Sequence, residues 1–254
     1  MGQRVELLSY GGGRQTVGLV ALIREGRLPR PDHVAMVDTN REKRSTFAYL
    51  DAYVRPALAD MGIPFTLIDR SRYATVDLWG GEDGDDFLPP AFTDRDSGDG
   101  KLPEFCSIEW KQRVVMRWAA EQPGWKGRGV TSWLGISWDE RHRRRSPNRQ
   151  WYQPAYPLLD RRWGLNVCLD AAHRAGWPEP PRSSCWFCPN MEDHEWAGLP
   201  ADEFEDACRL EEAVRERDPH LYFHRSMVPL RVVKLNPQAN PSLFGGGCKA
   251  GMCF

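Results

Sequence analysis

An apolar run near the start of the chain ends in residues suited to binding phosphate. The segment 7–16 reads LLSYGGGRQT, so three consecutive glycines open directly into a helical pattern. Glycines let backbone N–H groups converge on an anion, and the start of a helix adds its positive dipole end. The spacing matches neither the Walker P-loop nor a complete G-x-G-x-x-G fingerprint. The same glycines are also compatible with a flexible turn that binds nothing.

A second group of charged residues follows another predicted strand. The segment 135–140 reads GISWDE, and Arg143 comes three residues later. The carboxylates of Asp139 and Glu140 could hold Mg²⁺ against phosphates, and an arginine could clamp the phosphates themselves. The alternative is a charged, solvated loop. Two strand ends with phosphate-suited residues favour a shared ligand.

The seven cysteines point to metal or redox chemistry, because their number is odd and no export signal precedes them. Cys185 and Cys188 form a C-x-x-C pair, which can grip a metal or cluster or act as a redox dithiol. Cys106 precedes an amphipathic helix predicted over 107–120. At this position its thiol could be a third metal ligand, or Cys106 could be a small buried core residue. Periodicity predicts that Cys168 and Cys208 are core residues.

The first half of the chain alternates β-rich runs with helical patterns. This order predicts an α/β fold with a doubly wound parallel sheet, whose ligand crevice lies at the carboxyl ends of the strands. The acidic, glycine-rich segment 80–100 indicates a mobile excursion or a lid. Beyond Arg149 the pattern loosens into proline-rich connections around two helices. The predicted strands are 5–8, 33–37, 65–68 and 132–136. The predicted helices begin near residues 16 and 45 and cover 166–175 and 202–217.

Length and charge limit the classes of function. The 254 residues suffice for one domain with a sizeable core, with or without a small appendage. No apolar run approaches bilayer length, so we expect a cytoplasmic protein without a membrane partner. The formal charge of −1 requires any nucleic-acid binding to come from a local patch. The basic run 141–145, with Arg149, is the candidate, although such runs are commonly solvated faces.

Taken in order, these motifs resemble one enzyme family over nearly the whole chain. The glycine turn resembles the S-G-G-x-D-S pyrophosphate loop of the adenine nucleotide alpha hydrolase superfamily, the ATP pyrophosphatases. The other motifs resemble its phosphoadenosine-phosphosulfate-reductase-like branch. They are Asp38-Thr39 with Glu42, Thr46 and Tyr49, Cys106 with Lys111, the segment GISWDERHR, Tyr156-Pro157-Leu158, the CWFCP pair and the cysteine-bearing tail.

The resemblance implies that ATP lies across the strand ends and is cleaved at its α-phosphorus. Pyrophosphate would be released, and an adenylated substrate would remain, ready for sulfur. The implied nucleotide-binding residues are Ser9, Tyr10, Gly11, Gly12, Gly13, Arg14, Gln15, Thr16 and Gly135. The implied catalytic residues are Asp38, Lys111, Asp139, Glu140 and Arg143. Because Gln15 stands where the family has an aspartate, contact with Mg²⁺ would fall to Asp38 or Asp139.

The branch also implies an iron–sulfur cluster, of the 4Fe-4S type rather than zinc. Cys106, Cys185 and Cys188 would be three ligands, with Cys253, Cys248 or a sulfur-bearing substrate as the fourth. Residues 1–160 would form the nucleotide-binding domain and 161–254 a cysteine-rich region for cluster and substrate.

The leading functional hypothesis is nucleic-acid modification by sulfur insertion. Its preferred form is DNA phosphorothioation, with a cysteine desulfurase as sulfur donor and other sulfur-modification proteins as partners. The alternatives are tRNA thiolation and phosphosulfate or adenylylsulfate reduction. Reduction fits less well because the chain lacks both the E-C-G-x-H tail and the Cys-Cys pair of those reductases. A non-enzymatic alternative is a zinc-stapled nucleic-acid-binding module.

Overall fold

A computed structural model describes residues 2–95, 100–144 and 149–238. The described chain forms two compact units, one from 2–74 with 108–183 and the other from 75–107 with the residues from 184 onward. The elements of the first unit are β1 (Val5–Ser9), α1 (Arg14–Arg24), β2 (His33–Asp38), α2 (Arg44–Tyr49), η1 (Leu50–Val54), α3 (Arg55–Asp60), β3 (Phe65–Asp69), η2 (Arg70–Arg72), η3 (Ile108–Gln112), α4 (Arg113–Glu121), α5 (Trp125–Arg128), β7 (Val130–Trp133), η4 (Trp138–Arg143), β8 (Tyr152–Ala155), α6 (Pro157–Asp160) and α7 (Leu165–Arg174). Those of the second are β4 (Trp79–Gly80), β5 (Asp86–Phe87), β6 (Phe92–Thr93), α8 (Asp193–Ala197), α9 (Ala201–Arg217) and β9 (Leu221–Tyr222).

The first unit is built on a five-stranded sheet in the order β3-β2-β1-β7-β8. All four neighbouring pairs are parallel, and Leu8 of β1 lies opposite both Val34 of β2 and Trp133 of β7. The chain moves outward from β1 to β3 and then returns to the other side of β1. The point where strand order reverses therefore lies between β1 and β7, where sheets of this kind bind ligands.

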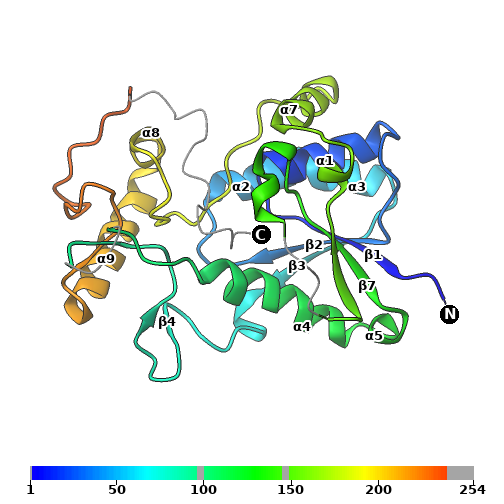
Figure 1. Ribbon diagram of the computed structural model, residues 1–254. Coiled ribbons are helices and arrows are strands. Elements are labelled where there is room, and N and C mark those ends of the chain that lie inside the picture. Colours follow the sequence, from blue (N-terminus) through cyan, green and yellow to red (C-terminus); the bar gives the residue numbers. More distant parts are fainter. Residues whose placement is uncertain (1, 96–99, 145–148, 239–254) are drawn as a thin grey trace. The chain divides into compact units, whose positions relative to one another are not determined.

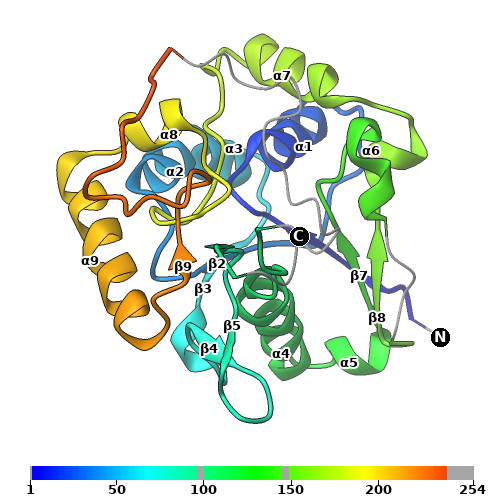
Figure 2. The ribbon, with the colours of Figure 1, turned by 60° about the vertical axis from the view of Figure 1, so that its left-hand side comes forward.

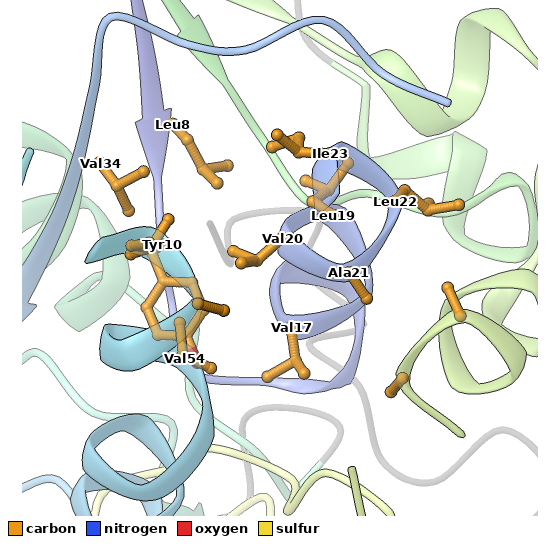
Figure 3. Close-up of a cluster of buried hydrophobic side chains, with 14 of the residues drawn as sticks. Leu8, Tyr10, Val17, Leu19, Val20, Ala21, Leu22, Ile23, Val34 and Val54 are labelled. Atoms are coloured by element: carbon orange, nitrogen blue, oxygen red, sulfur yellow. The ribbon is translucent and has the colours of Figure 1, made fainter. Parts of the chain in front are cut away.

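Helices cover both faces of this sheet, as Figure 1 shows. On one face, Leu8, Val34 and Trp133 pack with α1, α3 and α7, and Figure 3 shows part of this cluster around α1. On the other face, Leu7 and Val37 pack against α4. Because successive strand residues point to opposite faces, these short apolar runs fill two cores at once. The predicted doubly wound parallel sheet is confirmed.

The two helices α1 and α7 approach very closely in the first core (Figure 2). A Cβ atom added at Gly18 of α1 would lie 2.3 Å from the Cβ of Cys168 in α7. Cys168 is fully buried, as its periodicity predicts, and burial raises the pKa of its thiol to about 12. The thiol thus serves in packing.

The second unit is a smaller assembly of two antiparallel strand pairs and two helices. β4 pairs with β5, and β6 pairs with β9. Phe223 packs against Phe87 and Phe187, and the predicted core residue Cys208 is buried in α9. The buried carboxylate of Glu211 accepts the backbone N–H groups of Phe223 and Leu230, which fastens the chain after α9 onto that helix.

Two features of the described chain differ from the sequence expectations. The segment 80–100, expected to be a mobile excursion or lid, contributes β5 and β6 to the second unit. A fifth parallel strand, β8, lies among the prolines after Arg149. The chain passes from one unit to the other at 74/75, 107/108 and 183/184, and α7 packs on α1 within the first unit. The functional division at residue 160 stays a prediction. Among the described helices, none is long and apolar enough to cross a bilayer.

Candidate active site

The glycine turn lies at the carboxyl end of β1, beside the reversal of strand order. Tyr10 continues the pairing of β1 by donating its N–H to Ala35 at 2.8 Å. Gly12 has φ of +75°, which a side chain would disfavour, and Gly13 is the N-cap of α1. A Cβ at Gly12 would lie 2.4 Å from Cγ2 of Thr46, whereas one at Gly11 would meet no protein atom within 4 Å. The turn is closed on the α2 side and open at Gly11.

The N-terminus of α1 has the features of an anion site. No side chain caps it, and its first turn contains no acidic residue. The first intrahelical bond runs from the N–H of Val17 to the carbonyl of Gly13 at 2.9 Å, and the Thr16 hydroxyl donates to the same carbonyl at 3.1 Å. The amides of residues 14–16 precede that bond, so they are the N–H groups that a helix leaves for other acceptors.

The loop after β7 packs directly on this turn. A Cβ at Gly135 would lie 2.6 Å from Cγ2 of Thr16 and 3.3 Å from Cβ of Gln15. Side chains extend the contact, because Gln15 donates to Glu140 at 3.0 Å and Arg143 donates to the same carboxylate at 2.8 Å. The structure thus places the segments after β1 and β7 in direct contact, whereas the sequence alone indicates only that both follow strands.

Two of the predicted catalytic carboxylates accept hydrogen bonds from backbone N–H groups. Asp139 accepts the N–H of Leu165 at 2.7 Å, at the first residue of α7. Asp38 accepts the N–H of Asn40 at 2.7 Å, in the turn that follows β2, and Asn40 donates to Asp69 at the end of β3. Their predicted contact with Mg²⁺ stays a prediction.

Lys111 lies against a buried carboxylate. Its ammonium is 3.3 Å from Oε2 of Glu42, whose side chain is fully buried, and the Thr46 hydroxyl donates to Oε1 of the same group at 3.4 Å. Nearby Tyr10 is also buried, and among the described residues its hydroxyl has no hydrogen-bond partner. Burial raises the pKa of Tyr10 well above its ordinary value, and the charges of Tyr49 and Glu42 add to the shift. A buried polar layer therefore lies behind the glycine turn.

The remaining predicted nucleotide-binding residues have partners of their own. Ser9 shares a hydrogen bond of 2.8 Å with Ser132 on β7, which helps join the two strands at the reversal point. Arg14 pairs with Glu179 at 3.1 Å. Sequence reasoning missed Ser183, whose Oγ would lie 2.9 Å from a Cβ at Gly13. No spacing rule connects this serine with the turn, since 170 residues separate them.

The predicted cluster ligands Cys106, Cys185 and Cys188 lie in the second unit. Cys185 and Cys188 form a turn in which the N–H of Cys188 donates to the carbonyl of Cys185 at 3.1 Å, and both are partly exposed, as is Cys106. Within the described ranges, no group of three or more His, Cys, Asp or Glu side chains could hold a metal ion. Cys248 and Cys253 lie outside the described residues. The three-cysteine site stays a prediction.

Comparisons with known proteins show a distant structural likeness. No family model matches the chain, and no curated protein matches it. Among solved structures, the chain is similar to the U34-tRNA thiolase NcsA from Methanococcus maripaludis with its [4Fe-4S] cluster. The identity is 12%, the match covers 85% of this chain and 67% of that one, and the TM-score is 0.43. A likeness this distant carries no conclusion about activity or ligand.

The contact of Lys111 with the buried Glu42 carboxylate leads to a prediction about stability. Lys111→Met should lower the free energy of unfolding by about 3 kcal/mol, because it leaves the Glu42 carboxylate buried beside an apolar group. Denaturant unfolding measures the loss. The double variant Glu42→Gln/Lys111→Met should recover most of it, since the charge is then gone.

The exposed pair of Asp51 and Arg55, 2.8 Å apart, supplies the control. Asp51→Asn should cost about 1 kcal/mol or less, because water screens a surface pair. Equal losses for Lys111→Met and Asp51→Asn would contradict the structural role given to Glu42.

Proposed function

We propose that this protein is an ATP pyrophosphatase that adenylates a nucleic-acid acceptor in preparation for sulfur insertion. The observation that carries the proposal is the uncapped N-terminus of α1 behind three glycines, at the reversal of strand order between β1 and β7. Helix N-terminal amides and a positive dipole end favour phosphate at this position. The open side at Gly11 leaves room for the ligand.

The proposed step is a displacement at the α-phosphorus. An acceptor oxygen forms a bond to this phosphorus, the bond to the bridging oxygen of the β-phosphate breaks, and pyrophosphate leaves with the electron pair. The amides of 14–16 would bind the leaving pyrophosphate, and Arg143, oriented by Glu140, would reach phosphate oxygens from the β7 side. A sulfur nucleophile would then displace AMP from the activated acceptor.

Mg²⁺ would neutralise charge on the pyrophosphate, and Asp38 or Asp139 would hold it. Glu140 accepts hydrogen bonds on both oxygens, from Gln15 and Arg143. Asp38 and Asp139 each accept a backbone N–H on one oxygen. The protein's own charge stabilisation would come from the amides of residues 14–16 and from Arg143.

The acceptor and the sulfur source extend the proposal further. A DNA backbone and a tRNA base are both acceptors that adenylation can prepare for sulfur, and a cysteine desulfurase is the class of donor that supplies it. The two-thiol turn of Cys185 and Cys188 supports a metal or cluster role in the same pathway. Because the described thiols do not make a complete site, no step is derived through a cluster.

The first prediction of this function concerns which bond of ATP is cleaved. With a nucleic-acid acceptor and ATP labelled at the α- or γ-phosphate, the products should be AMP and pyrophosphate. Gly11→Val should fold normally, because the new Cβ meets no protein atom, yet weaken ATP binding at least tenfold by filling the open side of the turn. Calorimetry measures this affinity.

Gly127→Ala is the control, since a Cβ there also meets no protein atom, in α5 at the opposite end of the sheet. It should bind ATP like the unaltered protein. Gly12→Val should also abolish binding, but it tests packing at the same time because of its approach to Thr46. Formation of ADP and orthophosphate, or full affinity in Gly11→Val, would overturn the proposal.

The second prediction concerns the cysteines. Serine at Cys106, Cys185 or Cys188 should sharply reduce iron and sulfide in anaerobically purified protein, because each removes a thiolate ligand. Serine at the buried Cys168 or Cys208 should leave the metal content unchanged and reduce stability alone. Full iron content in Cys106→Ser would remove the three-ligand assignment. A colourless protein that contains zinc would replace the cluster with a structural metal.

A further inference from the structure

An exposed tryptophan stands beside the phosphate turn, in the first unit. Trp138 begins η4, three residues after Gly135, and 37% of its surface is exposed. The guanidinium groups of Arg141 and Arg162 lie 5.3 and 5.6 Å from the centre of its ring. The ring therefore has an arginine cation at each of two positions, and part of its surface remains open to solvent.

A second tryptophan with arginines over its ring is joined to Trp138 through the backbone. Trp163 lies 4.7 Å from the guanidinium of Arg27 and 5.5 Å from that of Arg161. The backbones of the two tryptophans are joined, because Trp138 donates its N–H to the carbonyl of Trp163 at 2.8 Å. The two rings and their arginines are called the Arg–Trp surface below.

The charge of this surface is opposite in sign to that of the chain as a whole. Its arginines outnumber its carboxylates, although the chain has a formal charge of −1. The arginines of these segments are Arg27, Arg141, Arg143, Arg144, Arg161 and Arg162, and the carboxylates are Glu25, Asp139, Glu140 and Asp160. Glu25 pairs with Arg27 at 3.6 Å, Asp139 accepts a hydrogen bond from Leu165, and Glu140 accepts one from Gln15. The remaining excess of positive charge favours a polyanion at this surface.

The backbone at Arg162 supplies an independent observation. Arg162 has φ of +54°, in the left-handed region, directly after the last turn of α6. Its N–H donates to Leu159 at 3.0 Å, and helix ends of this form usually carry glycine at the left-handed position. An arginine there costs about 1 kcal/mol relative to glycine. Its side chain reaches Trp138, so the strained position places a cation on the exposed ring.

We propose that the Arg–Trp surface binds single-stranded nucleic acid, with an unpaired base stacked on Trp138 and phosphates held by Arg141 and Arg162. Aromatic rings between arginines match the alternation of base and phosphate in a single strand. A duplex hides the faces of its bases, so it offers Trp138 nothing to stack on. Since Glu140 joins η4 to Gln15, a strand bound here would lie next to the phosphate turn.

This inference rests on the proposed function only for the step after binding, which is delivery of the acceptor to ATP. Binding itself can be measured without ATP. The probes are fluorescent 12-nucleotide single strands of DNA and of RNA and the corresponding duplexes, followed by anisotropy over a range of salt concentrations. The full-length protein is used throughout.

Trp138→Ala should weaken single-strand binding about tenfold, the worth of one stacked base. Trp138→Phe should restore most of the affinity. Arg162→Gly should also weaken binding and reduce the slope of log affinity against log salt by about 0.7, because one phosphate contact is lost. The same variant should melt at an unchanged or higher temperature, since glycine relieves the left-handed backbone. Weaker binding without a loss of stability separates a binding role from a structural one.

Arg72→Gln is the matched control, because its exposed side chain follows β3 at the other edge of the sheet. It should bind like the unaltered protein. Unaltered affinity in Trp138→Ala, an equal loss in Arg72→Gln, tighter binding of duplexes, or no binding of either single strand would overturn the proposal. Tighter binding of the DNA or of the RNA strand would identify the sugar of the acceptor.

Cleavage of ATP is assayed in parallel, so that the two proposals fail separately. Strand binding that depends on Trp138, in a protein that does not form AMP, would refute the proposed function and keep the Arg–Trp surface. Formation of AMP with no effect of Trp138→Ala on strand binding would refute the surface and keep the proposed function.

Discussion

The close approach of three segments around the glycine turn is the constraint on which the rest of the first unit depends. The left-handed Gly12 turns the chain from β1 into α1 while Thr46 approaches from α2, and Gly135 brings the loop after β7 onto the first turn of α1. A side chain at either glycine would push these segments apart. Because these segments are in close contact, the start of α1 stays at the point where strand order reverses.

Charge around this turn is arranged in two layers. Behind it, the buried carboxylate of Glu42 is matched by Lys111, which lets polar groups remain in the core. Beside it, Glu140 joins Gln15 of α1 to Arg143 of η4. The first pair balances a buried charge, whereas the second orients a cation next to the proposed phosphates. The Arg–Trp surface begins at the same element, so one short helix would serve both the nucleotide and the acceptor.

The sequence predicted the sheet well because its apolar runs are short, β-rich and separated by helical patterns. It also predicted that Cys168 and Cys208 are buried, because helical spacing places them among alanines and other apolar residues. It missed β8, where Pro154 reads as a loop signal, although an edge strand tolerates proline. The partners of Gln15, Asp139 and Lys111 were beyond prediction, since each contact joins residues 26 to 125 positions apart.

The most direct test of the central claim is a crystal structure of the protein with an ATP analogue whose α–β bridge is a methylene group, which blocks cleavage at the α-phosphorus. We expect its phosphates at the N-terminus of α1, with their oxygens about 2.7–3.2 Å from the amide nitrogens of residues 14–16. Arg143 should reach the same phosphates from the β7 side. A nucleotide bound elsewhere, with no phosphate at the glycine turn, would contradict the account.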